Sequence, residues 1–151
     1  MTKPTTLKTF IWFPGNMDAA LEFYAETFTE FVIHSDFNPK PGESRFTADF
    51  SICGHNFIGM NWPGGDPFNN AISLSLNVDG QAEVDRLWNA ITAKGKPGQC
   101  GWCTDEFGLT WQVSPIQMRE HLENPDREKA EYANKALQQI TKIIIKDLYR
   151  D

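Results

Sequence analysis

Residues 71–91 read AISLSLNVDGQAEVDRLWNAI and indicate a strand followed by a helix. In the first half, apolar residues at every second position from 72 to 78 alternate with three polar ones, Ser73, Ser75 and Asn77. A period of two predicts a strand with one apolar and one polar face. In the second half, apolar residues recur at the spacing of one helical face: Val84, Leu87, Trp88 and Ile91. We therefore expect an amphipathic helix directly after the strand.

The same pattern occurs earlier in the chain and indicates an internal repeat. The same helical spacing of apolar residues occurs 63 residues earlier, at Leu21, Tyr24, Ala25 and Phe28. The apolar run 10–13 takes the place of the strand. We expect the first helix to begin near Asn16 or Asp18 and the second near Asp79, because such side chains cap free N–H groups. Gly95 is expected to end the second helix.

Each predicted helix is followed by chain that favours strands. Alternation over 46–52 leads through a turn at 53–56 into 57–60, and 99–104 leads through 105–108 into 109–113. Both stretches predict hairpins with a glycine in the turn. We expect a single α+β domain over 1–151, with module one at about 6–62 and module two at about 69–115. A tail at about 116–151 contains an apolar helical stripe over 127–141.

Composition limits the classes of partner. The chain has 151 residues, a net charge of -6 and a pI of about 5.0, which argues against a nucleic-acid surface because that surface needs clustered Lys and Arg. No apolar run approaches the roughly 20 residues of a membrane span, so we expect no membrane association. The N-terminal residues lack an apolar signal segment, and three cysteines are an odd count. These features predict a cytoplasmic protein with free thiols.

Several stretches together resemble a known family. They are Trp12-Phe13 with Asn16 and Ala20, Phe23-Tyr24 with Phe28, Asn70–Leu74, Glu83–Trp88, Gly98–Trp102 and Asp105–Pro115. These resemble the glyoxalase/bleomycin resistance/dioxygenase (vicinal oxygen chelate) superfamily, and most closely its PhnB-like branch, labelled demethylubiquinone 3-methyltransferase. With the tail included, the resemblance covers nearly the whole chain. It implies two βαβββ modules whose curled mixed sheets surround a cup, an extra C-terminal helix, and a homodimer whose paired modules come from one chain or from two.

The resemblance also implies where a metal would bind. Metal sites of the superfamily take ligands from the first and last strands of each module, and the matching positions here are Phe10, Ile58, Ser73 and Gln112. Phe and Ile have no electron pair to donate, and Ser and Gln are weak neutral ligands. A transition metal needs about three or four His, Cys or carboxylate ligands. The sequence therefore predicts no metal at the usual position, and we expect no other cofactor.

Strand phase predicts which residues line the cup. The apolar side of each strand must face the helices, which have apolar stripes to bury. The opposite side then carries Phe10, Trp12, Asp49, Ser51, Asn56, Ile58, Met60, Ser73, Ser75, Asn77, Thr110 and Gln112. A mixed aromatic and neutral polar lining is typical of a small-molecule pocket, and the alternative is a closed, filled cup. Asp49 is the only acid in the set; buried without a cation it could act as a general base, whereas a surface aspartate would not.

Other motifs give weaker signals. Cys100-Gly101-Trp102-Cys103 is a C-x-x-C, but it falls in a predicted hairpin strand and not at the helix start that activates such thiols. One pair also provides too few ligands for structural zinc. A nucleotide-binding methyltransferase would need a glycine-rich turn between a strand and a helix, and the only Gly-Gly, at 64–65, precedes no helical pattern.

Three functions are compatible with these patterns. We favour metal-free binding of a small apolar or aromatic molecule in the cup of a cytoplasmic homodimer. The alternative is a vicinal oxygen chelate-type enzyme (lyase, isomerase, dioxygenase or the labelled methyltransferase) with a non-standard site. A third is that the tail helix and dimer surface bind a protein partner.

Overall fold

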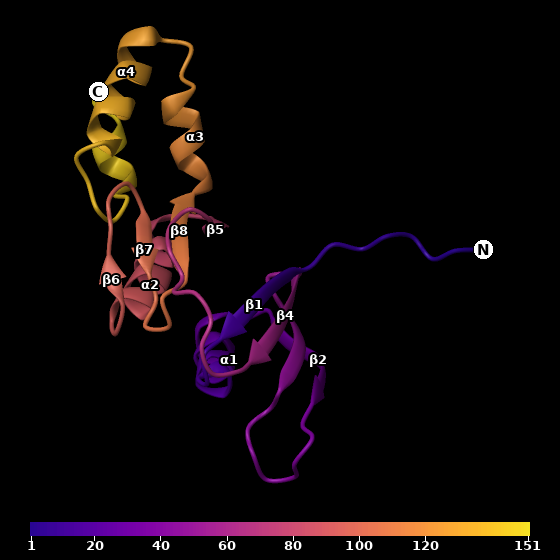
Figure 1. The fold of residues 1–151 in the computed structure, drawn as a ribbon. Coiled ribbons are helices and arrows are strands. Elements are labelled where there is room, and N and C mark those ends of the chain that lie inside the picture. Colours follow the sequence, from indigo (N-terminus) through magenta and orange to yellow (C-terminus); the bar gives the residue numbers. More distant parts are fainter. The chain divides into compact units, whose positions relative to one another are not determined.

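The computed structural model describes residues 1–151 and divides them into two compact units, Met1–Asp66 and Pro67–Asp151 (Figure 1). The division falls in the connection between the two expected modules. Each unit contains one βαβββ module with a four-stranded mixed sheet, so the expected α+β fold is confirmed.

Module one contains five elements: β1 (Thr9–Phe13), α1 (Met17–Thr27), β2 (Phe31–Phe37), β3 (Thr47–Ile52) and β4 (His55–Asn61). Its sheet has the order β1-β4-β3-β2. β1 runs parallel to β4, and the remaining pairs are antiparallel. The crossover helix α1 allows β1 to lie beside the last strand of the module.

Module two repeats this topology with β5 (Leu74–Val78), α2 (Gln81–Thr92), β6 (Lys96–Pro97), β7 (Trp102–Thr104) and β8 (Thr110–Pro115). Its sheet has the order β5-β8-β7-β6, with β5 parallel to β8. The sequence repeat is therefore a structural repeat.

The helix covers one face of the sheet in each module. In module one, a Cβ added to Gly59 would lie 2.7 Å from Met17 Sδ, so this position of β4 faces α1. In module two, the apolar stripe of α2 is buried as predicted: Val84, Leu87, Trp88 and Ile91. The α1 stripe differs from the prediction because Ala25 is exposed; Met17 and Ala20 are buried on α1 with Leu21 and Tyr24.

The predicted helix boundaries are nearly right, but the side chains expected to cap the two helices do not cap them. Asn16 occupies the N-cap of α1 without a side-chain cap bond, and Asp18 instead accepts bonds from Arg45. Gly80 is the N-cap of α2, while Asp79 accepts a bond from Gln117. Gly95 is required by packing, since a Cβ there would collide with the carbonyl oxygen of Thr104.

The tail forms α3 (Ile116–Leu122), α4 (Arg127–Leu137) and a short 3-10 helix, η1 (Ile145–Leu148), where one helix was expected. Figure 1 shows α3 continuing from β8, with α4 beside it. Asp126 caps α4 by accepting bonds from the backbone N–H groups of Glu128 and Lys129. A small core of Ala133, Ile143 and Leu148 holds these segments together. None of the helices has the length and apolar character needed to cross a membrane.

Candidate functional site

The face of the module-one sheet that points away from α1 carries the residues expected there. Phe10 is paired with Ile58, which is paired with Asp49, so the three form one row across the sheet. Trp12 and Met60 form part of the next row. Phe10 is 55% exposed and Trp12 39% exposed, so this face is largely uncovered within its unit.

Trp12 is held as a wall of this face. Its indole N–H donates to the carbonyl oxygen of Trp62 across 2.8 Å. A Cβ added to Gly65 would lie 2.9 Å from the Trp12 ring, so the loop after β4 packs directly on the indole. One side of the ring is thereby occupied by protein.

Ser51 and Asn56 lie at the far end of the same sheet, where they are paired with each other. Ser51 is buried, and its hydroxyl lies 2.9 Å from His34 Nε2. His34 lies at a register irregularity in β2, between Ile33 and Ser35. Its contact with Ser51 was not predicted, because a bulge breaks the alternation from which strand faces are inferred.

Asp49 does not meet the condition set for a general base. Its Oδ1 lies 2.6 Å from Lys8 Nζ, and both side chains are about one-third exposed. Ser35 Oγ donates to its second oxygen across 3.4 Å. Asp49 is therefore a paired aspartate at the surface of the sheet, which was the alternative interpretation.

The open face of the module-two sheet is mostly polar. Gln112 is flanked by Ser75 on β5 and by Trp102 on β7. Its side-chain amide donates to Ser73 Oγ across 2.8 Å. The 63-residue offset makes Ser73 the counterpart of Phe10. The strand register instead makes Ser75 the counterpart, because Ser75 pairs with Gln112 as Phe10 pairs with Ile58. Ser73 and Ser75 lie on the same face, so the predicted side of the sheet is unchanged.

The remaining predicted residues of module two lie at opposite ends of the sheet. Thr110 is buried beside Thr104. Asn77 is exposed and borders a second hollow of about 530 Å³ against α3. The predicted set is thus placed on the open faces of two separate sheets, and its role in binding a ligand stays a prediction.

The donor set on these faces does not fit a divalent transition metal. The four positions implied by the resemblance provide a phenyl ring, an aliphatic chain, a hydroxyl and an amide. No group of three or more His, Cys, Asp or Glu side chains in the chain is arranged to hold a metal ion. The nearest titratable side chains on the module-one face, His34 and Asp49, are engaged with Ser51 and Lys8.

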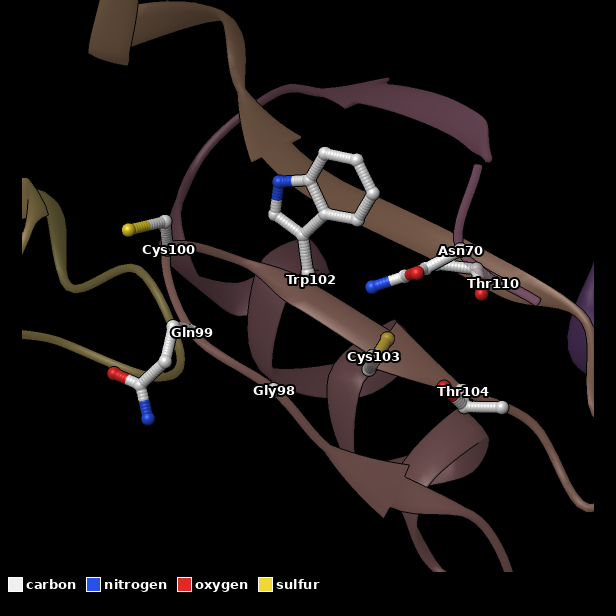
Figure 2. A pocket seen from close by; sticks show the side chains of 8 residues that line it. All are labelled: Asn70, Gly98, Gln99, Cys100, Trp102, Cys103, Thr104 and Thr110. Atoms are coloured by element: carbon white, nitrogen blue, oxygen red, sulfur yellow. The ribbon is translucent and has the colours of Figure 1, made fainter. Parts of the chain in front are cut away.

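A pocket of about 520 Å³ opens beside β7 of the module-two sheet (Figure 2). Eight residues line it: Asn70, Gly98, Gln99, Cys100, Trp102, Cys103, Thr104 and Thr110. Only Thr110 was among the predicted residues. Trp102 was missed because β7 has three residues, too few to show a period, although its pairing with Gln112 places it on the predicted face.

The wall of this pocket is braced by the tail. The backbone N–H groups of Cys100 and Gly101 donate to the carbonyl oxygens of Ile140 and Thr141, at 2.8 and 2.7 Å. Cys100 Sγ donates to the Leu137 carbonyl oxygen across 3.1 Å. Ile143 packs against Gly101, where a Cβ would lie 2.7 Å from Ile143 Cδ1. The tail therefore fixes the turn that precedes β7.

The C-x-x-C motif lies on this packed strand. Burial, with a smaller effect from the charge of Asp105, raises the pKa of the Cys103 thiol to about 12. None of the three cysteines forms a disulfide. A thiol that keeps its proton is a poor nucleophile, so the geometry of Cys103 favours packing over redox chemistry.

The turn that leads into β8 is organised by Asp105. This buried carboxylate accepts bonds from the backbone N–H groups of Phe107 and Leu109 and from Trp111 Nε1, all between 2.9 and 3.0 Å. Asp105 is a turn residue, as its sequence context predicted.

Comparisons with known proteins give a consistent similarity. The family model described as 3-demethylubiquinone-9 3-methyltransferase matches residues 5–114. A PhnB protein from Bacillus cereus with the same designation has 21% identity and a TM-score of 0.67, and the alignment covers 74% of this chain and 100% of that one. A protein from Pseudomonas aeruginosa has 22% identity, a TM-score of 0.57, and coverage of 73% and 98%. No curated protein matches the chain.

These matches agree with the fold and correct one expectation. The family model ends at residue 114, so α3, α4 and η1 lie outside the match, whereas the resemblance was expected to include the tail.

Proposed function

Because the chain belongs to the 3-demethylubiquinone-9 3-methyltransferase family of PhnB-type, glyoxalase-fold proteins, we propose that it binds a small apolar or aromatic molecule without a metal. The observation that carries this proposal is the donor set. Phe10 and Ile58 lie side by side at two of the implied ligand positions. At the other two, Ser73 and Gln112 bond to each other. Such a site can bind by shape and neutral hydrogen bonds, but it lacks strong metal ligands.

The uncovered aromatic face of module one supports binding. Phe10, Trp12 and Phe37 are large apolar side chains with exposures of 55%, 39% and 56% on one sheet. Strand pairing through Thr47 and Met60 puts Phe37 in the same row as Trp12, so these exposed side chains share one face. Apolar side chains exposed together in this way favour a ligand or protein interface. We propose that a homodimer forms and that this face lines the cup, where it meets either ligand or the partner subunit.

The methyltransferase designation of the family suggests a different activity. A methyl donor with a nucleoside part would need a site for its charged and polar groups. The connection before α1 is Pro14-Gly15-Asn16 and the one before α2 is Asp79-Gly80, and neither is a glycine-rich loop. The residues thus favour binding without methyl transfer.

Two measurements on the purified full chain test this proposal. Elemental analysis of the protein as purified, without a chelator, should find no stoichiometric transition metal. A thermal-shift screen of the same sample against neutral aromatic compounds, aliphatic compounds and S-adenosylmethionine should give stabilisation by aromatic or aliphatic compounds and none by S-adenosylmethionine. Tightly bound metal would overturn the proposal. Stabilisation by S-adenosylmethionine would favour the enzyme, and no response to any compound would remove the binding function.

A further inference from the structure

We infer that the pocket beside Trp102 is the binding site, and that its ligand is a planar, uncharged aromatic ring system with a hydrogen-bonding substituent. This inference rests on the proposed function and narrows it to one place and one class of molecule. It uses a pocket that strand phase alone did not identify.

Trp102 provides a fixed aromatic surface. Its backbone N–H donates to Gln99 O across 3.0 Å, and its carbonyl oxygen accepts from Gly98 N across 2.8 Å, so the residue is held in a tight turn. Figure 2 shows the indole standing off β7 and bordering the pocket. The ring is half-buried, which leaves part of it accessible. An accessible indole on a fixed backbone turn favours stacking with a planar ring.

Polar side chains lie near the indole. Figure 2 shows the Asn70 amide directed towards the space beside Trp102, and Thr110 also lines this pocket. Asn70 is exposed, and Thr104 and Trp102 are half-buried, so their polar groups are within reach of a ligand. A few polar groups in a pocket fix the orientation of a ligand through hydrogen bonds. This arrangement therefore suits a ligand with at least one hydrogen-bonding group on its ring.

The pocket also selects against charge. Its lining side chains include no carboxylate, ammonium or guanidinium group, since they are amides, hydroxyls, thiols and an indole. The nearby carboxylate of Asp105 is engaged with Trp111 inside the core. An anionic or cationic ligand would lose water without gaining a counter-charge, which is costly. A volume of about 520 Å³ is within the range of small-molecule sites.

Three matched probes test the ligand class on the full-length protein. They are 2-naphthol, which is planar, neutral and hydrogen-bonding; 2-naphthoate, which adds a charge; and decahydro-2-naphthol, which is not planar. Two-dimensional ¹H–¹⁵N NMR should show 2-naphthol shifting the signals of Gly98, Thr104 and the Trp102 indole N–H. The other two probes should bind at least about tenfold more weakly, as expected for lost stacking or unpaired charge.

Variants test the location. Trp102→Ala should weaken 2-naphthol binding by about tenfold or more, and Trp102→Phe should retain part of the affinity. The matched control is Trp62→Ala, which removes a 56% exposed indole outside the pocket and should leave the affinity unchanged. If Trp102→Ala does not fold, Trp102→Leu removes the aromatic plane while keeping an apolar side chain. Unchanged affinity in either variant would overturn the inference.

The outcome also separates this inference from the broader proposal. Shifts confined to the Phe10–Trp12 face would overturn the Trp102 site and leave metal-free binding intact. Tighter binding of 2-naphthoate would overturn the ligand class. Failure of all aromatic compounds to bind would overturn this inference, and failure of the aliphatic compounds as well would overturn both.

Discussion

The side-chain amide of Gln112 donates a hydrogen bond to the hydroxyl of Ser73 across 2.8 Å on the open face of the module-two sheet. These are two of the four positions at which the resemblance implies metal ligands. Here the two side chains form a hydrogen bond with each other. The pair is thus a polar feature of the sheet that needs no cation.

This pairing predicts a small stability difference between neighbouring serines. Ser73→Ala removes the acceptor of a half-buried hydrogen bond, so the free energy of unfolding should fall by about 1 kcal/mol. The control is Ser75→Ala, two residues further on in β5, whose side chain is exposed and whose loss should cost less than about 0.5 kcal/mol. Urea unfolding measures both. Equal costs would mean that the Gln112–Ser73 bond is not formed in solution.

The buried carboxylate of Asp105 predicts a larger loss. Asp105→Ala leaves the N–H groups of Phe107, Leu109 and Trp111 without their acceptor. Hydrogen bonds to a charged group contribute about 1.5–3 kcal/mol each, and they are not additive. We expect the free energy of unfolding to fall by about 3 kcal/mol. Glu106→Ala, at the exposed neighbouring position, should change it by less than about 0.5 kcal/mol; similar losses in the two variants would contradict this role.

The raised pKa of Cys103 predicts a loss of stability in base. Burial and the charge of Asp105 raise the pKa from 9.0 to about 12, so the folded protein keeps the proton longer than the unfolded chain. The stabilisation of the folded state by the protonated Cys103 thiol is complete below pH 9.0 and is lost as the pH rises towards about 12. At about pH 10.5 the free energy of unfolding should have fallen by about 2 kcal/mol through this effect.

The measurement compares the protein with Cys103→Ala. The difference in unfolding free energy between about pH 7.5 and about pH 10.5 should be smaller in the variant by the amount that Cys103 contributes. In the native state, Cys53 should react readily with iodoacetamide because it is exposed, while buried Cys103 should not. An identical pH dependence in both proteins, or rapid alkylation of Cys103, would refute the assignment.

The contacts between α2 and the tail predict that a substitution in α2 loosens the wall of the pocket. Gln81 binds the tail twice, donating to Ile143 O across 3.0 Å and accepting from Ile145 N across 2.8 Å. Gln81→Ala should loosen the tail and speed hydrogen exchange at Cys100 and Gly101, whose N–H groups donate to Ile140 and Thr141. Exchange measured by NMR should not change in Gln139→Ala, an exposed tail position. Unaltered protection in Gln81→Ala would show that the tail does not brace the turn.

Packing of Ile143 should matter in the same way. Its side chain is fully buried against Gly101, so Ile143→Ala should lower the free energy of unfolding by about 3 kcal/mol. The neighbouring Ile144 is half-buried, and Ile144→Ala should cost less. Denaturant unfolding followed by fluorescence distinguishes the two, and a smaller effect at Ile143 would contradict the packing described here.

The sequence was most informative where side chains alternate over several residues. In β5, the alternation of leucine with serine and asparagine predicts both the strand and its faces, because burial of one face requires that period. In β1, the repeat gives the correct side for Phe10 and Trp12 even though the run is uniformly apolar. These two strands carry four of the twelve predicted lining residues, namely Phe10, Trp12, Ser75 and Asn77.

The features that the sequence did not predict depend on contacts between distant residues. Asp18 and Asp79 look like helix caps, but Arg45 and Gln117 bind them instead, from 27 and 38 residues away. Trp102 is on a strand of three residues, so only its pairing with β8 reveals its face. The pocket wall depends on the tail carbonyls of Ile140 and Thr141, whose partners no local pattern identifies.

The most direct test of metal-free binding is calorimetric titration of 2-naphthol into the EDTA-treated protein, repeated after addition of excess Zn²⁺. The donor set of Phe10, Ile58, Ser73 and Gln112 predicts the same affinity in both titrations, and no separate heat of Zn²⁺ binding. Binding that appears only after Zn²⁺ is added would contradict the proposal.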